Sequence, residues 1–140
     1  MKSILVISHG TFGKGLVETA EIFFGKIKAL DYLLLTGEET AESFRKRLCE
    51  TVNQMDEGEG VLILADLYGG TPCNQTIYLS NLPVHVIAGV NLGMLMEAIA
   101  LRDTGDLDYD ELIKKSQNNI VDFTKKIQEK RNRKEEKAGR

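Results

Sequence analysis

The chain has 140 residues, of which 42% are hydrophobic and 28% are charged, as in an ordinary globular domain. No apolar run reaches the roughly 18 residues of a membrane span, and the apolar start is too short for a signal peptide, so we expect a cytoplasmic protein. Cys49 and Cys73 lack metal-ligand spacing, and we expect neither a metal site nor a disulfide.

Charge is distributed unevenly along the chain. Residues 125–140 hold 8 of the 18 basic and 3 of the 21 acidic side chains, which makes this segment +5 and residues 1–124 −8. An acidic body of this kind argues against a nucleic-acid partner. We predict a domain of residues 1–128 followed by a charged, frayed tail over residues 129–140. A basic contact for an acidic partner is the alternative role of that tail.

Apolar patterns alternate between strands and helices along the chain. Short apolar runs predict strands over residues 2–7, 29–35, 61–65 and 84–88. Helical spacing predicts helices over about 11–25, 40–55, 72–79, 94–101 and 109–129. The last of these has the apolar stripe Leu112, Ile113, Ile120, Phe123 and Ile127. Thr40 and Thr71 are predicted to cap the second and third helices.

This alternation predicts a doubly wound α/β fold with a mainly parallel four-stranded sheet and helices on both faces. In the strand order 2-1-3-4 the first and third strands are neighbours, and the switch point lies between their carboxyl ends. His9 ends the first strand, and residues 66–72 follow the third. We therefore expect these two segments to converge at the edge of the sheet where ligands bind.

A histidine, a carboxylate and a glycine-rich helix start together predict a phosphohistidine site. Neutral imidazole is nucleophilic near pH 7. Asp66 could accept a hydrogen bond from one ring nitrogen of His9 and stabilise the phosphorylated cation. Backbone N–H groups around Gly70 and Thr71, with the Thr71 hydroxyl, could hold the phosphoryl oxygens. No metal or cofactor is expected, and no Walker-type sequence supports ATP chemistry.

The candidate site thus has two catalytic residues, His9 and Asp66, and a phosphoryl-binding set, Ser8, Gly10, Gly69, Gly70 and Thr71. Each residue taken alone has a structural explanation: a histidine in a turn, an aspartate beside a helix, and glycines in a capped loop. Their convergence at one sheet edge favours the functional interpretation. His85 lies in the middle of the fourth predicted strand, and we expect it to be structural.

Three separated segments resemble one protein family. They are Ile-Ser-His-Gly at residues 7–10, Asp-Leu-Tyr-Gly-Gly-Thr-Pro-Cys-Asn at 66–74 and Val-Ile-Ala-Gly-Val-Asn-Leu-Gly-Met-Leu at 86–95. In this order they resemble the mannose-class IIA components of the bacterial phosphoenolpyruvate-dependent sugar phosphotransferase system. The resemblance extends over residues 1–125, and it implies the fold that the apolar pattern predicts.

The resemblance also implies a function. His9 would accept a phosphoryl group at Nε2, with Nδ1 facing Asp66, from the histidine phosphocarrier protein (HPr). It would pass the group to a IIB component, which serves the membrane components IIC and IID. The resemblance further implies a homodimer, and in some relatives a C-terminal strand is exchanged. Residues 103–140 show no clear fifth strand that could be exchanged in this way. Many relatives are fused to a IIB domain, whereas this chain ends in a charged tail, so we expect a free-standing IIA subunit.

Three other functions stay open at this point. A phosphocarrier subunit for dihydroxyacetone kinase would share the fold and the Ser-His opening. A histidine phosphatase would need an arginine in place of Ser8 and a second catalytic histidine, for which the mid-strand His85 is a poor candidate. A regulator could bind a target protein according to its phosphorylation state.

Overall fold

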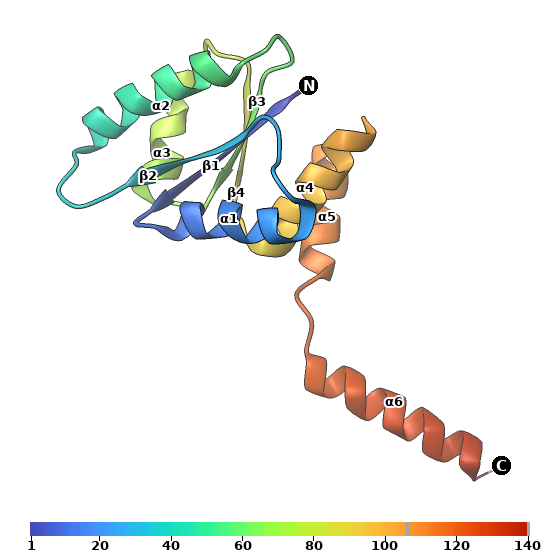
Figure 1. Ribbon diagram of the computed structural model, residues 1–140. Helices are drawn as coiled ribbons and strands as arrows, with labels where there is room; N and C mark the ends of the chain where they lie inside the picture. Colours follow the sequence, from blue (N-terminus) through green and yellow to red (C-terminus); the bar gives the residue numbers. More distant parts are fainter. Residues whose placement is uncertain (106, 140) are drawn as a thin grey trace.

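A sheet of four parallel strands forms the centre of the molecule (Figure 1). The structure is a computed structural model that describes residues 1–105 and 107–139. Its strands are β1 (Ser3–His9), β2 (Leu30–Leu35), β3 (Val61–Ala65) and β4 (Val84–Ala88), in the order β2-β1-β3-β4. All neighbouring pairs are parallel. The predicted fold class and strand order are confirmed.

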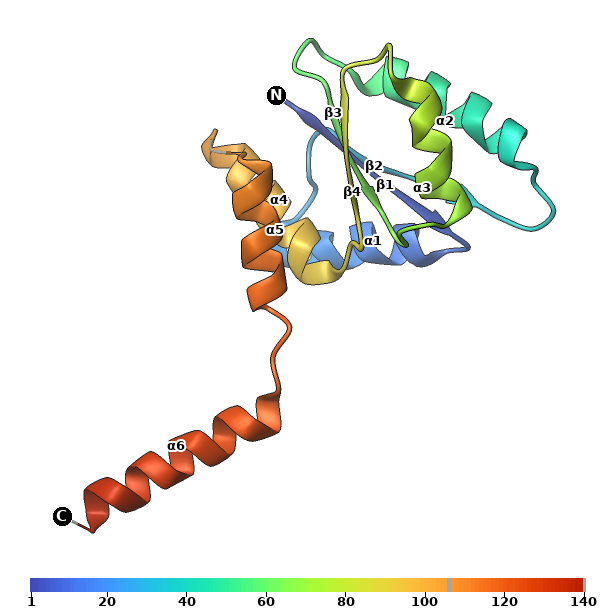
Figure 2. The same cartoon turned by 180° about the vertical axis from the view of Figure 1, so that it is seen from behind.

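Helices cover both faces of the sheet, as Figure 1 and Figure 2 show from opposite sides. One face carries α1 (Phe12–Phe24), α4 (Leu92–Thr104) and α5 (Tyr109–Asn118). The other carries α2 (Ala41–Met55), α3 (Thr71–Gln75) and the 3-10 turn η1 (Thr76–Leu79). Among the described residues, none of the helices combines the length and apolarity needed to cross a bilayer.

Alternate residues of β1 belong to the two cores on either side of the sheet. Ile4 and Val6 pack in the core under α1 and α4, whereas Leu5 and Ile7 pack in the core under α2. All four side chains are 0% exposed. Burial on both faces explains the continuous apolar run of this strand. His9 is the first exposed residue of β1, so two packed layers hold the strand up to the point where the histidine emerges.

Side-chain caps begin several of the helices. Thr40 Oγ1 accepts a hydrogen bond from the backbone N–H of Ser43 at 3.1 Å, at the start of α2. Asn91 Oδ1 accepts one from the N–H of Met94 at 2.8 Å, at the start of α4. Such caps satisfy N–H groups that have no partner within the helix. The Thr40 cap is confirmed.

The C-terminal region differs from the prediction of one helix over residues 109–129. Helix α5 ends at Asn118, and a separate helix, α6 (Phe123–Ala138), begins after Asp122. Asp122 Oδ1 accepts the N–H of Lys125 at 3.0 Å and so caps the new helix. Ile120 and Phe123 are 76% and 68% exposed. These apolar residues do continue the helical spacing of Leu112, but the interruption between α5 and α6 turns them away from the core in which Leu112 is buried.

The predicted frayed tail also differs from the structure. Helix α6 continues to Ala138, and the boundary expected at residue 128 falls inside it. No residue of α6 is buried, and in Figure 2 the helix extends away from the body. A high content of lysine, glutamate, arginine and glutamine is compatible with a helix, because these residues have good helix propensity. Charge alone therefore did not distinguish a frayed tail from a solvated helix.

Candidate active site

The two predicted catalytic residues emerge side by side from neighbouring strands. Ile7 of β1 is in register with Ala65 of β3, and the backbone N–H of Asp66 donates to Ile7 O at 3.1 Å. His9 is the last residue of β1, and Asp66 directly follows β3. Both lie at the carboxyl edge of the sheet, where the strand order reverses. The predicted convergence is therefore present.

One oxygen of Asp66 holds His9 by two hydrogen bonds. Asp66 Oδ2 lies 2.8 Å from His9 Nδ1 and accepts the backbone N–H of His9 at 2.9 Å. A carboxylate only accepts, so this contact places the ring proton of neutral His9 on Nδ1. The lone pair then resides on Nε2. Because the His9 side chain is 47% exposed and that of Asp66 is 12% exposed, the nucleophile is open and its partner is sheltered.

The second oxygen of Asp66 faces inward. Asp66 Oδ1 is buried and has no hydrogen-bond partner in the described part of the chain. A buried acceptor without a partner costs free energy, and the cost is greater for a charged group. A positive charge on the adjacent imidazole would offset part of this cost. The carboxylate can therefore stabilise the positive charge that forms on the His9 ring when Nε2 is phosphorylated.

Gly70 allows the His9 ring to lie against the loop backbone. A Cβ atom added at Gly70 would stand 2.7 Å from Cε1 and 3.5 Å from Nε2 of His9. Side-chain atoms do not approach this closely, so any larger residue at this position would have to displace the His9 ring. Gly69, with φ +85°, turns the chain just before it. The Gly-Gly pair thus brings the start of α3 against the imidazole.

Thr71 is not the cap that its sequence suggested. It is the first residue of α3, Gly70 occupies the cap position, and no side chain caps this helix. Asn74 instead supports the loop, because its Nδ2 donates to Gly69 O at 3.2 Å. The Gly70 N–H donates to Leu67 O at 3.2 Å. Since that N–H is engaged, the N–H and hydroxyl of Thr71 are the candidate donors of this loop.

Ser8 and Gly10, which were predicted to bind a phosphoryl group, both make hydrogen bonds that support the His9 loop. Ser8 is 0% exposed, and its Oγ accepts the N–H of Gly13 at 2.8 Å. The N–H of Gly10 donates to Leu35 O at 2.9 Å, and its φ of +54° favours glycine. Both groups are already committed to α1 and β2. The sequence alone does not show which polar groups beside a histidine are used in this way.

Exposed apolar side chains in the same two segments were not among the predicted site residues. Tyr68 is 88% exposed, Leu67 58% and Phe12 47%. Leu67 and Tyr68 follow Asp66 directly, and Phe12 begins α1 three residues after His9. Apolar residues in a polar, glycine-rich loop were the available signal. Exposed aromatic and aliphatic groups next to a reactive residue are typical of a protein-docking surface.

The second histidine of the chain lies elsewhere. His85 is on β4, where its ring stacks on Tyr109 of α5 with centroids 3.6 Å apart. Partial desolvation, and then the charge of Lys2, hold the pKa of His85 below its ordinary value, while Asp110 acts in the opposite direction. The expectation that His85 is structural agrees with this packing, and a phosphatase with two catalytic histidines is not supported. Among the described residues, no three His, Cys, Asp or Glu side chains form a metal-binding group.

Comparison with known proteins gives consistent matches over the body of the chain. Residues 3–117 match the family described as "PTS system fructose IIA component". The chain is 33% identical over 113 residues to the mannose-specific EIIAB component of Escherichia coli K12, covering 79% of this chain and 35% of that protein. It thus spans about a third of that relative's length. It is 29% identical over 105 residues to the fructose-specific EIIA component of Bacillus subtilis 168, covering 74% and 72% respectively.

Solved structures agree with the fold. Phosphotransferase system component EIIA from Streptococcus agalactiae has a TM-score of 0.77 and 30% identity, covering 89% of this chain and 99% of that chain. A PTS IIA protein associated with the fucose utilization operon of Streptococcus pneumoniae has a TM-score of 0.79 and 28% identity, covering 90% and 96%. All the candidate site residues lie within the matched residues 3–117.

Proposed function

Because this chain belongs to the family of IIA components of the sugar phosphotransferase system, mannose and fructose class, we propose that it carries a phosphoryl group on His9. The donor is phosphorylated HPr and the acceptor is a IIB component. The observation that carries this proposal is the 2.8 Å contact between His9 Nδ1 and Asp66 Oδ2. It favours a free lone pair on Nε2, which is the atom that we assign to the new bond.

The transfer is a displacement at phosphorus. The Nε2 lone pair of His9 forms a bond to phosphorus as the bond from phosphorus to the donor's histidine nitrogen breaks, and the donor ring recovers that electron pair. His9 keeps its Nδ1 proton and becomes a phosphorylated cation, which Asp66 stabilises. In the second transfer, the nucleophile of the IIB component attacks phosphorus and His9 leaves as a neutral ring.

The start of α3 supplies candidate donors for the phosphoryl oxygens. The N–H and hydroxyl of Thr71 are first among them, since the Gly70 N–H is engaged. Gly69 and Gly70 leave the space in which the group would lie. Exposed Tyr68 and Leu67 next to the site would contact the protein partners during transfer.

The proposed partners extend from HPr and IIB to the membrane components IIC and IID, so that the phosphoryl group ends on a sugar. We also propose a cytoplasmic location and a homodimer. Two features support the homodimer: β4 forms an edge of the sheet, and exposed apolar residues follow α5. Unpaired sheet edges and exposed apolar segments both favour association.

The experiment is phosphorylation of the purified chain with phosphoenolpyruvate, enzyme I and HPr, followed by intact mass. We expect one acid-labile phosphate, which His9→Ala abolishes. His85→Ala is the matched control, since His9 and His85 are the only histidines of the chain. Label that survives in His9→Ala, or that is lost in His85→Ala, would contradict the assignment. If this donor gave no label but a phosphoryl donor of the dihydroxyacetone kinase pathway did, the chain would be assigned to that pathway instead.

A further inference from the structure

Helix α6 is a feature that the phosphocarrier function does not use. It lies after the residues that match the family, and none of its residues is buried. Figure 1 shows it apart from the sheet and from the helices that cover it. Most helical stability in proteins comes from packing, so α6 depends on the intrinsic helix propensity of its residues alone. A partner that covers one face would stabilise it.

Five basic side chains share one face of α6. At about 100° per residue, they fall within an arc of about 100° around the helix axis. We call this set the basic stripe: Lys126, Lys130, Arg133, Lys134 and Lys137. The acidic residues of the helix fall outside that arc: Glu129, Glu135 and Glu136. The stripe therefore runs along most of a helix that is about 24 Å long.

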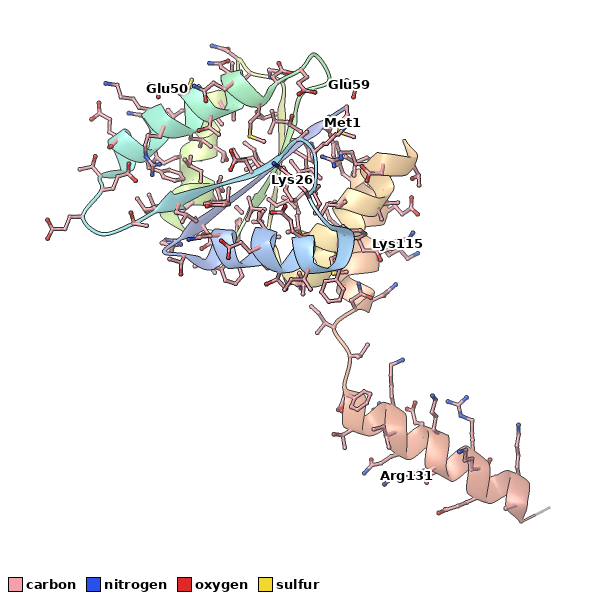
Figure 3. All side chains as sticks on the ribbon, viewed as in Figure 1. Met1, Lys26, Glu50, Glu59, Lys115 and Arg131 are labelled. Atoms are coloured by element: carbon pink, nitrogen blue, oxygen red, sulfur yellow. The ribbon has the colours of Figure 1, made fainter. Side chains whose placement is uncertain are left out.

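The stripe is open to solvent over its whole length. All five side chains are exposed, and over residues 1–105 and 107–139 none of them forms an ion pair with a carboxylate. In Figure 3 the side chains of α6 extend from the helix without touching the body. Residues 1–124 have a net charge of −8, yet none of those carboxylates neutralises the stripe. The positive charge is therefore available to another molecule.

We propose that the basic stripe binds the anionic headgroups of a lipid membrane surface. A row of lysines on an exposed helix suits such a surface, because each charge is attracted without the need for a shaped pocket. On the first two turns, Phe123 lies within the arc of the stripe and Ile127 at its edge, where they can contact the boundary between headgroups and acyl chains. Lipid thus matches both the charge and the apolar end of this face.

A protein partner, including a second copy of this chain, matches the stripe less well. Lysine is depleted in the centres of protein interfaces, where aromatic residues and arginine are enriched. Four of the five stripe residues are lysine, and beyond Ile127 the stripe contains no apolar residue. A nucleic acid is also less favoured, because Phe123 is a single aromatic side chain at one end of the stripe and offers no row of rings on which successive bases could stack. Both remain outcomes of the test.

The test is co-sedimentation of the full chain with vesicles. Vesicles of phosphatidylcholine with about 30% phosphatidylglycerol should bind the protein at about 0.05 M salt and release it at about 0.5 M, whereas pure phosphatidylcholine should not bind it. Lys130→Glu with Lys134→Glu should weaken binding about tenfold or more. The matched control is Lys125→Glu with Arg131→Glu, which changes the net charge equally but lies outside the stripe. It should bind far closer to the unchanged chain.

Several results would overturn the proposal. They are an absence of binding to the anionic vesicles, an equal loss in both double variants, or tighter binding to duplex DNA than to vesicles. A change of oligomeric state in the stripe variant, measured by light scattering, without a change in vesicle binding would assign the stripe to a second copy. His9→Ala should bind vesicles like the unchanged chain, so this test is independent of phosphoryl transfer.

Discussion

A methyl group on Gly70 would stand 2.7 Å from Cε1 of His9, closer than side-chain atoms approach in a folded protein. The imidazole therefore lies between the carboxylate of Asp66 and the backbone of Gly70, and both residues belong to the loop that joins β3 to α3. The close approach of the Gly70 backbone thus restricts the ring orientation, in addition to the hydrogen bond with Asp66. A side chain added at position 70 should therefore change the reactivity of His9.

Gly70→Ala should slow phosphoryl transfer to His9 about tenfold or more while leaving the fold intact, because the new methyl group must push the ring away from Asp66 Oδ2. Single-turnover labelling from phosphorylated HPr measures this rate. Gly15→Ala is the matched control, since an added Cβ there meets nothing within 4 Å and alanine is the better helix former. A normal rate in Gly70→Ala would show that the ring has room to move.

Asp66→Asn should slow transfer by about 10²-fold or more, because the amide can still orient the ring but cannot balance the cation that forms. Asp66→Ala should be at least as slow. Rapid-quench transfer kinetics measure the rate, and thermal unfolding shows whether the fold persists. The control is Asp31→Asn on β2, where the carboxylate is exposed. A rate unchanged by both Asp66 variants would reduce this residue to a structural role.

Ser8→Ala separates a support from a phosphoryl ligand. The change removes the acceptor of the buried Gly13 N–H, so we expect a loss of about 1–3 kcal/mol in the free energy of unfolding. The folded fraction should still accept phosphate at His9. Urea denaturation and intact mass measure the two effects, with the exposed Ser80→Ala as control. Normal stability with lost labelling would return Ser8 to the phosphoryl-binding set.

His85 should make stability depend on pH. Partial desolvation, and then the charge of Lys2, lower its pKa in the folded protein below the ordinary value of about 6.5. Above that value both states hold a neutral ring, whereas at lower pH the unfolded chain takes up the proton first. The contribution of His85 is therefore full near pH 7.5 and declines as pH falls below about 6.5, for example at about pH 5.5. Urea unfolding of the native chain and of His85→Gln at both pH values should show a stability difference that shrinks in acid.

The central part of the fold could be predicted from sequence because its signals are local. The doubly buried strands read as continuous apolar runs, and Thr40 is a polar residue placed directly before a helical pattern. The convergence of His9 with Asp66 followed from strand order alone. These predictions needed only periodicity and the rule that sites form at a switch point.

The parts that could not be predicted depend on tertiary contacts. Ile120 and Phe123 continue the helical spacing of Leu112, and only packing decides that the chain breaks between them. The hydroxyl of Ser8 looks available beside His9, but Gly13 occupies it through a turn of α1. Thr71 has the residue type of a cap, yet Gly70 takes that position because the backbone must pass close to the imidazole.

The half-exposed position of His9 affects how long a phosphoryl group can stay on it. With 47% of its side chain open, a phosphoryl group attached there would meet water as readily as it meets a partner. The protein would then hold its cargo only for the chemical lifetime of the phosphorus–nitrogen bond. Delivery must outrun hydrolysis, so the waiting time between encounters with the acceptor would limit the yield of each cycle.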